Sequence, residues 1–350
     1  MAVHPVLAAA GQFLHLSRTQ AELFNQPQSL SLSDGTQVTI HAAGIIEFAP
    51  INAATQAILL SCGIHGNETA PIEILDAMVQ DILCGRLVVK HRLMVQFGNL
   101  PAMDIAERFV DENMNRLFSG AHSKAPGLVN QERIRAKQLE DCTRAFFLKD
   151  LLPRCHYDLH TAIRASKNDK FAVYPFLHGK PWKAQQISFM QACGVNTILL
   201  SNSPTTTYSY FSSHQFGADA FTVELGKVRP FGQNNMADFA EVTSTLRALV
   251  AGEALNLPDY QDDAVNLFSV NQVINKTQPD FRLHFADDAP NFSDFKQGEL
   301  LASETGHEYR ALVDGEAIVF PNANVALGQR ALLTVAPVTL QQANEGKADV

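Results

Sequence analysis

Short apolar runs recur along the first two thirds of the chain, each bounded by polar or turn-forming residues. Runs of this length and composition are typical of buried strands, and they cover residues 56–61, 91–98, 155–160, 171–175, 196–200 and 219–225. Helical patterns lie between several of them, at residues 70–84, 131–150, 181–193 and 235–252. The alternation predicts an α/β fold, with a mostly parallel or mixed sheet flanked by helices. Upstream, the alternating stretch 37–42 predicts an edge hairpin.

The pattern changes after Leu255. A polar break at residues 258–263 is followed by short strand-like runs, such as 265–270 and 330–336, and by no long helical pattern. We therefore predict a main domain of residues 1–255 and a small C-terminal β domain of residues 256–350, a usual size for an appended domain. The polar stretch 341–350 is expected to fray.

Composition narrows the class of function. The chain has 350 residues with 46% hydrophobic residues and a net charge of −9, which argues against a nucleic-acid binder but not against a small anionic substrate. No apolar run approaches the roughly 20 residues that span a bilayer, so no membrane partner is expected. The first residues lack a basic stretch, which indicates a mature N-terminus rather than a secretion signal. Five scattered cysteines suggest reduced thiols and a cytoplasmic protein.

The most informative motif is a pair formed by His65 and Glu68, where the apolar run 56–61 gives way to a predicted helix. His160 ends another strand-like run. Two imidazoles and one carboxylate form the ligand set of a catalytic zinc, which keeps a fourth position open. A His-x-x-Glu pair alone is weak evidence, and a lone histidine such as His160 is more often structural. Both elements end strands, however, where open α/β folds bind ligands, and this agreement favours a metal site.

Two further segments carry candidate chemistry. Arg108 and Arg116 flank a polar segment in which Asn115 precedes Arg116, and arginine suits bidentate recognition of carboxylates. An exposed loop with ordinary ion pairs accounts for this pattern equally well. Glu224 is the single carboxylate of the apolar run 221–226. A buried carboxylate is costly unless it is paired, so Glu224 is a candidate general base or acid, or else a strand-end residue that faces solvent.

These motifs together resemble a known family. The succinylglutamate desuccinylase/aspartoacylase family, within the zinc carboxypeptidase-like superfamily, has the same motifs in the same order. In this chain they are His65-Gly-Asn-Glu68, Gly98-Asn99, Arg108, Asn115-Arg116, Asp158-Leu-His160 and Val223-Glu224-Leu-Gly226. The resemblance spans roughly residues 50 to 335 and implies a carboxypeptidase-like α/β core with a C-terminal β domain.

The resemblance also implies a reaction and a role for each residue. It implies a zinc-dependent amidohydrolase that cleaves N-succinyl-L-glutamate to succinate and L-glutamate, the last step of arginine breakdown by the succinyltransferase route. One zinc ion would be bound by His65, Glu68 and His160. Glu224 would act as general base on water and then protonate the departing amine, and Arg108 would stabilise the oxyanion. Asn115 and Arg116 would hold a substrate carboxylate.

Other interpretations remain open at this point. The substrate is alternatively another N-acyl amino acid such as N-acetylaspartate, or a peptide, and a metal-free binding protein on the same scaffold is a further alternative. The intact ligand set and Glu224 favour an enzyme. Aspartoacylases place an additional arginine before the base, but residues 205–220 contain none, so His214 or Arg229 is expected to hold the remaining carboxylate.

Overall fold

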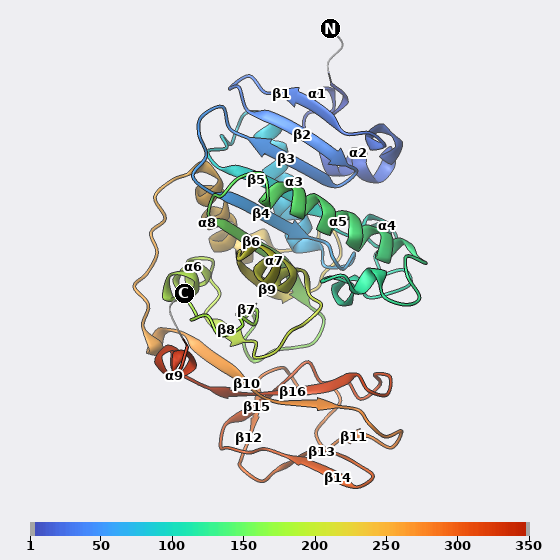
Figure 1. Ribbon diagram of the computed structural model, residues 1–350, viewed down its shortest axis with the longest axis vertical. Coiled ribbons are helices and arrows are strands. Elements are labelled where there is room, and N and C mark those ends of the chain that lie inside the picture. Colours follow the sequence, from blue (N-terminus) through green and yellow to red (C-terminus); the bar gives the residue numbers. More distant parts are fainter. Residues whose placement is uncertain (1–3, 348–350) are drawn as a thin grey trace.

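The structure of the protein is a computed structural model that describes residues 4–347 (Figure 1). Its main feature is a 13-stranded mixed sheet of order β1-β2-β3-β5-β4-β6-β9-β7-β8-β10-β16-β15-β12, and a second sheet has the order β11-β13-β14. The strands of the first part are β1 (Gln28–Ser31), β2 (Gln37–Ala42), β3 (Ile45–Ala49), β4 (Ala57–Cys62), β5 (Arg92–Phe97), β6 (Arg154–Ala162), β7 (Phe171–Tyr174), β8 (Thr197–Leu200) and β9 (Asp219–Lys227). The later strands are β10 (Asn266–Asn275), β11 (Arg282–Leu283), β12 (Ser293–Phe295), β13 (Leu300–Glu304), β14 (His307–Arg310), β15 (Glu316–Val319) and β16 (Arg330–Pro337).

The helices are α1 (Pro5–Ala8), α2 (Phe13–Thr19), α3 (Thr69–Leu83), α4 (Leu100–Asp104), α5 (Gln131–Phe147), α6 (Ala184–Ala192), α7 (Tyr208–Phe216), α8 (Ala240–Ala251) and α9 (Leu340–Asn344). Helices α3–α8 lie between strands of the large sheet, α1 and α2 precede β1, and α9 follows β16. The six predicted strands correspond to β4–β9, and the four predicted helices to α3, α5, α6 and α8. The stretch 37–42 forms β2, which pairs antiparallel with β1 and β3 at one end of the sheet. The α/β fold class is therefore confirmed.

Side chains of β4 show how the sheet is covered on both faces. Ile58 and Leu60 belong to one apolar cluster with residues of α3, α6 and α8. Ala57 and Leu59 belong to another cluster with residues of α5 and α7. Because successive side chains of a strand point to opposite faces, this division places helices on both sides of the sheet.

In the C-terminal β region, which comprises β10–β16, the strands β10, β16, β15 and β12 continue the large sheet, whereas β11, β13 and β14 form the second sheet (Figure 1). β10 pairs in parallel with β8 and antiparallel with β16. The division of the chain at residue 255 stays a prediction. No helix within residues 4–347 is long and apolar enough to cross a membrane.

The expected fraying of residues 341–350 is wrong for their first part. α9 begins at a capping box formed by Thr339 and Gln342. Asn344 fixes the helix to the main domain, because its side chain accepts a hydrogen bond from the Trp182 amide at 2.8 Å and donates to the Trp182 carbonyl at 3.1 Å. These bonds compensate for a polar sequence with little apolar surface. Residues 348–350 lie outside the described part of the chain.

Three adjacent parallel strands determine where the functional residues meet. β6 lies between β4 and β9, and it pairs in parallel with both. The carboxyl ends of the three strands therefore reach the same edge of the sheet, and the segments that follow them begin there.

A buried carboxylate, Glu47 on β3, connects this strand to its neighbours. It is 5% exposed and contacts His41 at 3.0 Å, Lys149 at 3.2 Å and Arg92 at 3.4 Å. Burial alone would raise the pKa of Glu47, but the hydrogen bond with His41 and the charges of Lys149 and Arg92 outweigh it. The resulting pKa is about 2, against an ordinary value of 4.5.

This shift gives a prediction for stability. Ionised Glu47 stabilises the folded state fully above pH 4.5, and the contribution is lost as the pH falls from 4.5 towards 2; a shift of this size corresponds to on the order of 3 kcal/mol. Glu47→Gln should lower the urea midpoint at pH 7, and the difference from wild type should shrink at pH 3. Glu308→Gln, at an exposed position, is the control. A difference that is the same at both pH values would contradict the prediction.

Candidate metal centre and active site

The turn after β4 brings His65 and Glu68 to the edge of the sheet. Gly63 has a φ of +65°, a conformation that L side chains rarely adopt. A Cβ added to Gly66 would lie 2.2 Å from the backbone carbon of Ala102, so only glycine fits against α4 there. Glu68 is the residue immediately before α3.

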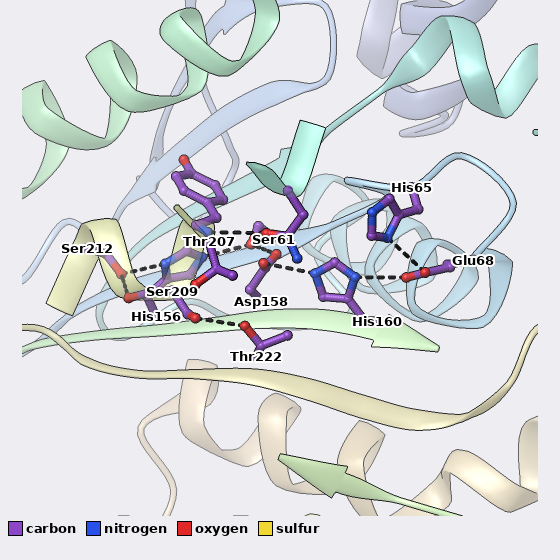
Figure 2. Close-up of polar contacts among 12 residues, drawn as sticks. Ser61, His65, Glu68, His156, Asp158, His160, Thr207, Ser209, Ser212 and Thr222 are labelled. Carbon is purple, nitrogen blue, oxygen red and sulfur yellow. Dashed lines mark hydrogen bonds and ion pairs between the residues drawn. The ribbon is translucent and has the colours of Figure 1, made fainter. Parts of the chain in front are cut away.

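His65, Glu68 and His160 converge at this edge (Figure 2). Nδ1 of His65 lies 2.8 Å from Oε1 of Glu68, and Nδ1 of His160 lies 2.8 Å from Oε2 of Glu68. One ligand atom from each residue lies within 4.8 Å of the others, and all three side chains are buried. The structure thus brings the three predicted ligands together in a group that can hold a metal ion.

The second nitrogen of each imidazole has its own partner. Nε2 of His65 lies 2.9 Å from Oδ1 of Asn113, and Nε2 of His160 lies 2.9 Å from Oδ2 of Asp158. In Figure 2 the His160 ring lies between Asp158 and Glu68. Metal-binding histidines almost always hold their other ring nitrogen in this way, which fixes the orientation of the ring. The donor set and its supporting contacts therefore fit a metal ion bound through the Nδ1 atoms.

Asp158 is itself held by a buried network of polar side chains on one face of β6. Its Oδ1 lies 2.5 Å from Ser61 Oγ, which lies 2.7 Å from His156 Nε2. His156 Nδ1 lies 2.7 Å from Ser212 Oγ on α7. Burial lowers the pKa of His156 to about 4, so the ring is neutral near pH 7. The network connects β4, β6 and α7 and holds Asp158 with its Oδ2 toward His160.

The charges of the three ligands also fit a dication. Burial alone would raise the pKa of Glu68, but His65 and His160 outweigh this effect and hold the pKa well below its usual range. Burial would lower the pKa of His160, whereas the carboxylates of Asp158 and Glu68 raise it well above the ordinary value. The negative charge of two buried carboxylates beside an imidazole is balanced either by a proton on the ring or by a bound cation. A dication bound to the ring would take the place of that proton.

Glu224 is placed beside the ligand set by strand pairing. It is the register partner of His160 where β6 and β9 run in parallel. The side chain is half-buried, and its Oε2 is buried without a hydrogen-bond partner among the described residues. Burial and the negative charge of Glu68 raise the pKa of Glu224 to about 7, against the opposing effect of His160 and Arg108. Such a carboxyl group can both accept and release a proton near neutral pH.

Arg108 and the Asn115–Arg116 pair lie on the segment between α4 and α5. Nη1 of Arg108 donates to Oε1 of Glu68 at 2.6 Å, so this guanidinium group lies next to the ligand set. The carbonyl of Asn115 accepts from Arg116 Nη1 at 3.1 Å, and its Oδ1 accepts from the Tyr208 amide at the start of α7 at 3.4 Å. The Arg116 side chain is accessible to solvent.

The candidates for the remaining carboxylate do not join this group. His214 stacks on Tyr210 and His178, with ring centroids 5.3 Å and 4.4 Å away. The backbone carbonyl of Arg229 accepts from Thr69 Oγ1 at 2.6 Å. Within residues 4–347, no hydrogen bond or ion pair joins either side chain to the three candidate ligands. No contact therefore supports either assignment.

Sequence reasoning missed the residues that support the ligands. Asn113 lies in an irregular segment, so no periodic pattern pointed to it. Asp158 was part of a recognised motif but had no role assigned. A signal was present, because His156, Asp158 and His160 are two residues apart and so share one face of a strand. Polar residues on one face of an otherwise apolar strand indicate a buried polar network.

Comparison with known proteins agrees with this geometry. The succinylglutamate desuccinylase/aspartoacylase catalytic domain matches residues 54–250, and the AstE/AspA barrel-sandwich hybrid domain matches residues 263–338. A succinylglutamate desuccinylase of Pseudoalteromonas atlantica is 59% identical over 337 residues, which cover 95% of this chain and 96% of that protein. A homologue of the same name from Shewanella denitrificans is 51% identical and covers 88% of this chain and 90% of its own.

Solved structures give the same result. The crystal structure of the succinylglutamate desuccinylase from Chromobacterium violaceum has a TM-score of 0.83 at 39% identity, covering 93% of this chain and 98% of that chain. The enzyme of that name from Vibrio parahaemolyticus has a TM-score of 0.85 at 34% identity and covers 93% and 95% of the two chains. On these matches, which extend over nearly the whole chain, the protein belongs to the succinylglutamate desuccinylase/aspartoacylase family.

Proposed function

We propose that the protein is a zinc-dependent amidohydrolase that cleaves N-succinyl-L-glutamate to succinate and L-glutamate, the last step of arginine breakdown by the succinyltransferase route. The names of its relatives support this substrate, and they cover most of the chain at up to 59% identity. The observation that carries the proposal is the convergence of two imidazoles on one buried carboxylate, with an unpartnered carboxyl oxygen of Glu224 beside them. Metal ligands and a proton-transfer group in one place are what amide hydrolysis requires.

The metal would be held by His65, Glu68 and His160. Nitrogen and carboxylate ligands in this number suit zinc, with a position left for substrate or water. A bound zinc ion would polarise the scissile carbonyl and lower the pKa of the attacking water. The arrangement of Asn113 and Asp158 behind the two imidazoles supports this assignment, because it directs Nδ1 of each ring toward Glu68.

Glu224 would transfer the proton. In the first half of the reaction its carboxylate accepts a proton from the attacking water, and in the second half the same group donates that proton to the departing amine. A carboxyl group with a pKa raised to about 7 suits both roles, because neither state is strongly preferred. The positive charge of a bound dication would lower this pKa and favour the base in the first step.

The arginines would bind and orient an anionic substrate. Arg108 uses one N–H group for Glu68, and its remaining donors, which have no partner within residues 4–347, would stabilise negative charge on the carbonyl oxygen. Asn115 and Arg116 would hold a carboxylate of the substrate. Asn115 Nδ2 supports this role, since it has no hydrogen-bond partner among residues 4–347.

We further propose that the enzyme works in the cytoplasm on a small anionic substrate, with neither nucleic acid nor membrane as a partner. The five cysteines are free thiols, which suits a reducing compartment. The net charge of −9 disfavours contact with nucleic-acid phosphates.

The first prediction concerns the substrate. The purified protein should hydrolyse N-succinyl-L-glutamate, lose activity when its metal is removed by a chelator, and regain it with zinc. N-Acetyl-L-glutamate and N-acetyl-L-aspartate should be cleaved much more slowly, because a site built for three carboxylates keeps unpaired charges when one is missing. Assay of the freed amine measures all three rates. Equal rates for the succinyl and acetyl compounds would reduce the function to that of a general N-acyl amino acid hydrolase.

The second prediction concerns Glu224. Glu224→Gln keeps the size of the side chain but cannot exchange a proton, so kcat should fall by about 10²–10⁴-fold. Metal content, measured by atomic absorption, should stay near that of the wild type. A variant with nearly normal turnover would show that Glu224 is structural.

The third prediction concerns Asp158. Asp158→Asn weakens the bond to His160 Nε2 and disturbs the contact with Ser61, so the affinity for zinc should fall by about 10–100-fold. Competition with a chromophoric chelator measures this affinity directly. Asp259→Asn, at an exposed position far along the chain from the ligands, serves as a control for the same exchange. Unchanged affinity in Asp158→Asn would mean that the network does not support the metal.

A further inference from the structure

Two arginines near the site have no carboxylate partner among the described residues. There, the Arg116 side chain donates a single hydrogen bond, which goes to a backbone carbonyl. Arg330, the first residue of β16, makes no side-chain hydrogen bond or ion pair within residues 4–347, and its guanidinium carbon lies 5.9 Å from the centre of the Phe320 ring. Eight of the fifteen arginines, Arg116 and Arg330 among them, make no ion pair with a carboxylate of this part of the chain.

Packing of aromatic rings connects Arg330 to the catalytic strand. Phe320 lies 5.9 Å from Phe171, centre to centre. Phe171 is the register partner of Glu224 where β7 and β9 pair. The guanidinium group of Arg330 therefore stacks on a ring that packs against a direct neighbour of Glu224, although the two residues are more than a hundred positions apart in the sequence.

Hydrogen bonds fix the C-terminal β region at this point. Arg164, four residues after His160, donates to the carbonyls of Asp287, Ala289 and Pro321 at 2.7, 2.9 and 3.0 Å. Pro321 directly follows Phe320, the residue on which Arg330 stacks. Three charge-assisted hydrogen bonds therefore hold the segment that contains Phe320 near the end of β6.

Although the Arg116 side chain reaches solvent, the protein atoms around it, and then the positive charges of Arg330 and Arg108, lower its pKa to about 10. Burial also lowers the pKa of Arg330. Neighbouring like charges without a counter-ion raise the free energy of the ligand-free protein, and an anion bound between them removes that cost.

We propose that Arg330, supplied by the C-terminal β region, binds the side-chain carboxylate of the glutamate moiety while Arg116 binds its α-carboxylate. The inference rests on the proposed function. Arg330, held near the end of β6 through Phe320, and Arg116 are two cations for the part of the substrate that carries two carboxylates, and the glutamate moiety has two whereas the succinyl group has one. Arg330 is then the residue that makes the enzyme specific for glutamate over neutral amino acids.

The test compares Arg330→Gln, Arg330→Lys and wild type on three substrates. N-Succinyl-L-glutamine has a neutral side chain of the same shape, and N-acetyl-L-glutamate lacks the CH2–COO⁻ end of the succinyl group. For N-succinyl-L-glutamate, Arg330→Gln should lower kcat/KM by about 10–100-fold, mainly through KM, because a charged hydrogen bond is lost. The loss should persist for N-acetyl-L-glutamate and should nearly vanish for N-succinyl-L-glutamine. Arg330→Lys should be intermediate, since it keeps the charge but not the planar fork.

Each other outcome has a clear meaning. Equal losses on the glutamate and glutamine substrates would overturn the proposal and make Arg330 structural, and a loss confined to the two succinyl substrates would assign it to the acyl carboxylate instead. Thermal unfolding of each variant separates instability from lost binding. Arg310→Gln, which removes an exposed arginine of the same region paired with Glu308 at 2.7 Å, should behave as wild type. If wild type does not cleave N-succinyl-L-glutamate at all, the proposed function fails before any variant is compared.

Discussion

The active site is organised by the need to compensate one buried negative charge. Glu68 is 2% exposed, and an ionised carboxylate at such a position costs several kcal/mol unless it is paired and hydrogen-bonded. Its Oε1 contacts His65 and Arg108, and its Oε2 contacts His160 and the Thr161 amide. These contacts come from the turn after β4, the segment after α4 and the end of β6. Compensation of a single charge therefore determines how three separate parts of the chain meet.

The polar contacts that compensate Glu68 continue into the sheet through β6. On β6, His156, Asp158 and His160 face one side, whereas Tyr157 and Leu159 face the apolar cluster on the other side. A polar strand face needs polar groups on the element that covers it, and α7 provides them through serine side chains such as Ser212, which contacts His156. This also shows why α7 was not predicted as a helix. It is buried on almost all sides, so its sequence lacks the alternation of apolar and polar faces by which surface helices are recognised.

Elements with a clear local pattern could be predicted from the sequence, and contacts between distant segments could not. Strands such as β4 and β6 were recognised because short apolar runs bounded by turn residues are typical of buried strands. The candidate ligands were recognised because spacing, strand ends and family motifs agreed. Asn113 and Arg330 were not recognised as candidates, because their positions depend on an irregular loop and on how distant strands pair. Local patterns predict elements and motifs, but they do not predict which unpaired side chains from distant segments will face one another.

The distribution of charge over the whole molecule follows from the function of the site. The protein carries a net charge of −9, and its average field therefore repels a substrate with three carboxylates. Binding must then come from cations that the fold leaves unpaired and holds in fixed positions. Arg116 satisfies this condition, since its only hydrogen-bond partner in the described part of the chain is a neutral backbone carbonyl. An unpaired arginine makes the ligand-free protein less stable than one in which a carboxylate pairs with it. A polyanionic substrate supplies the missing partner, so the same free energy favours binding of that substrate over neutral ones.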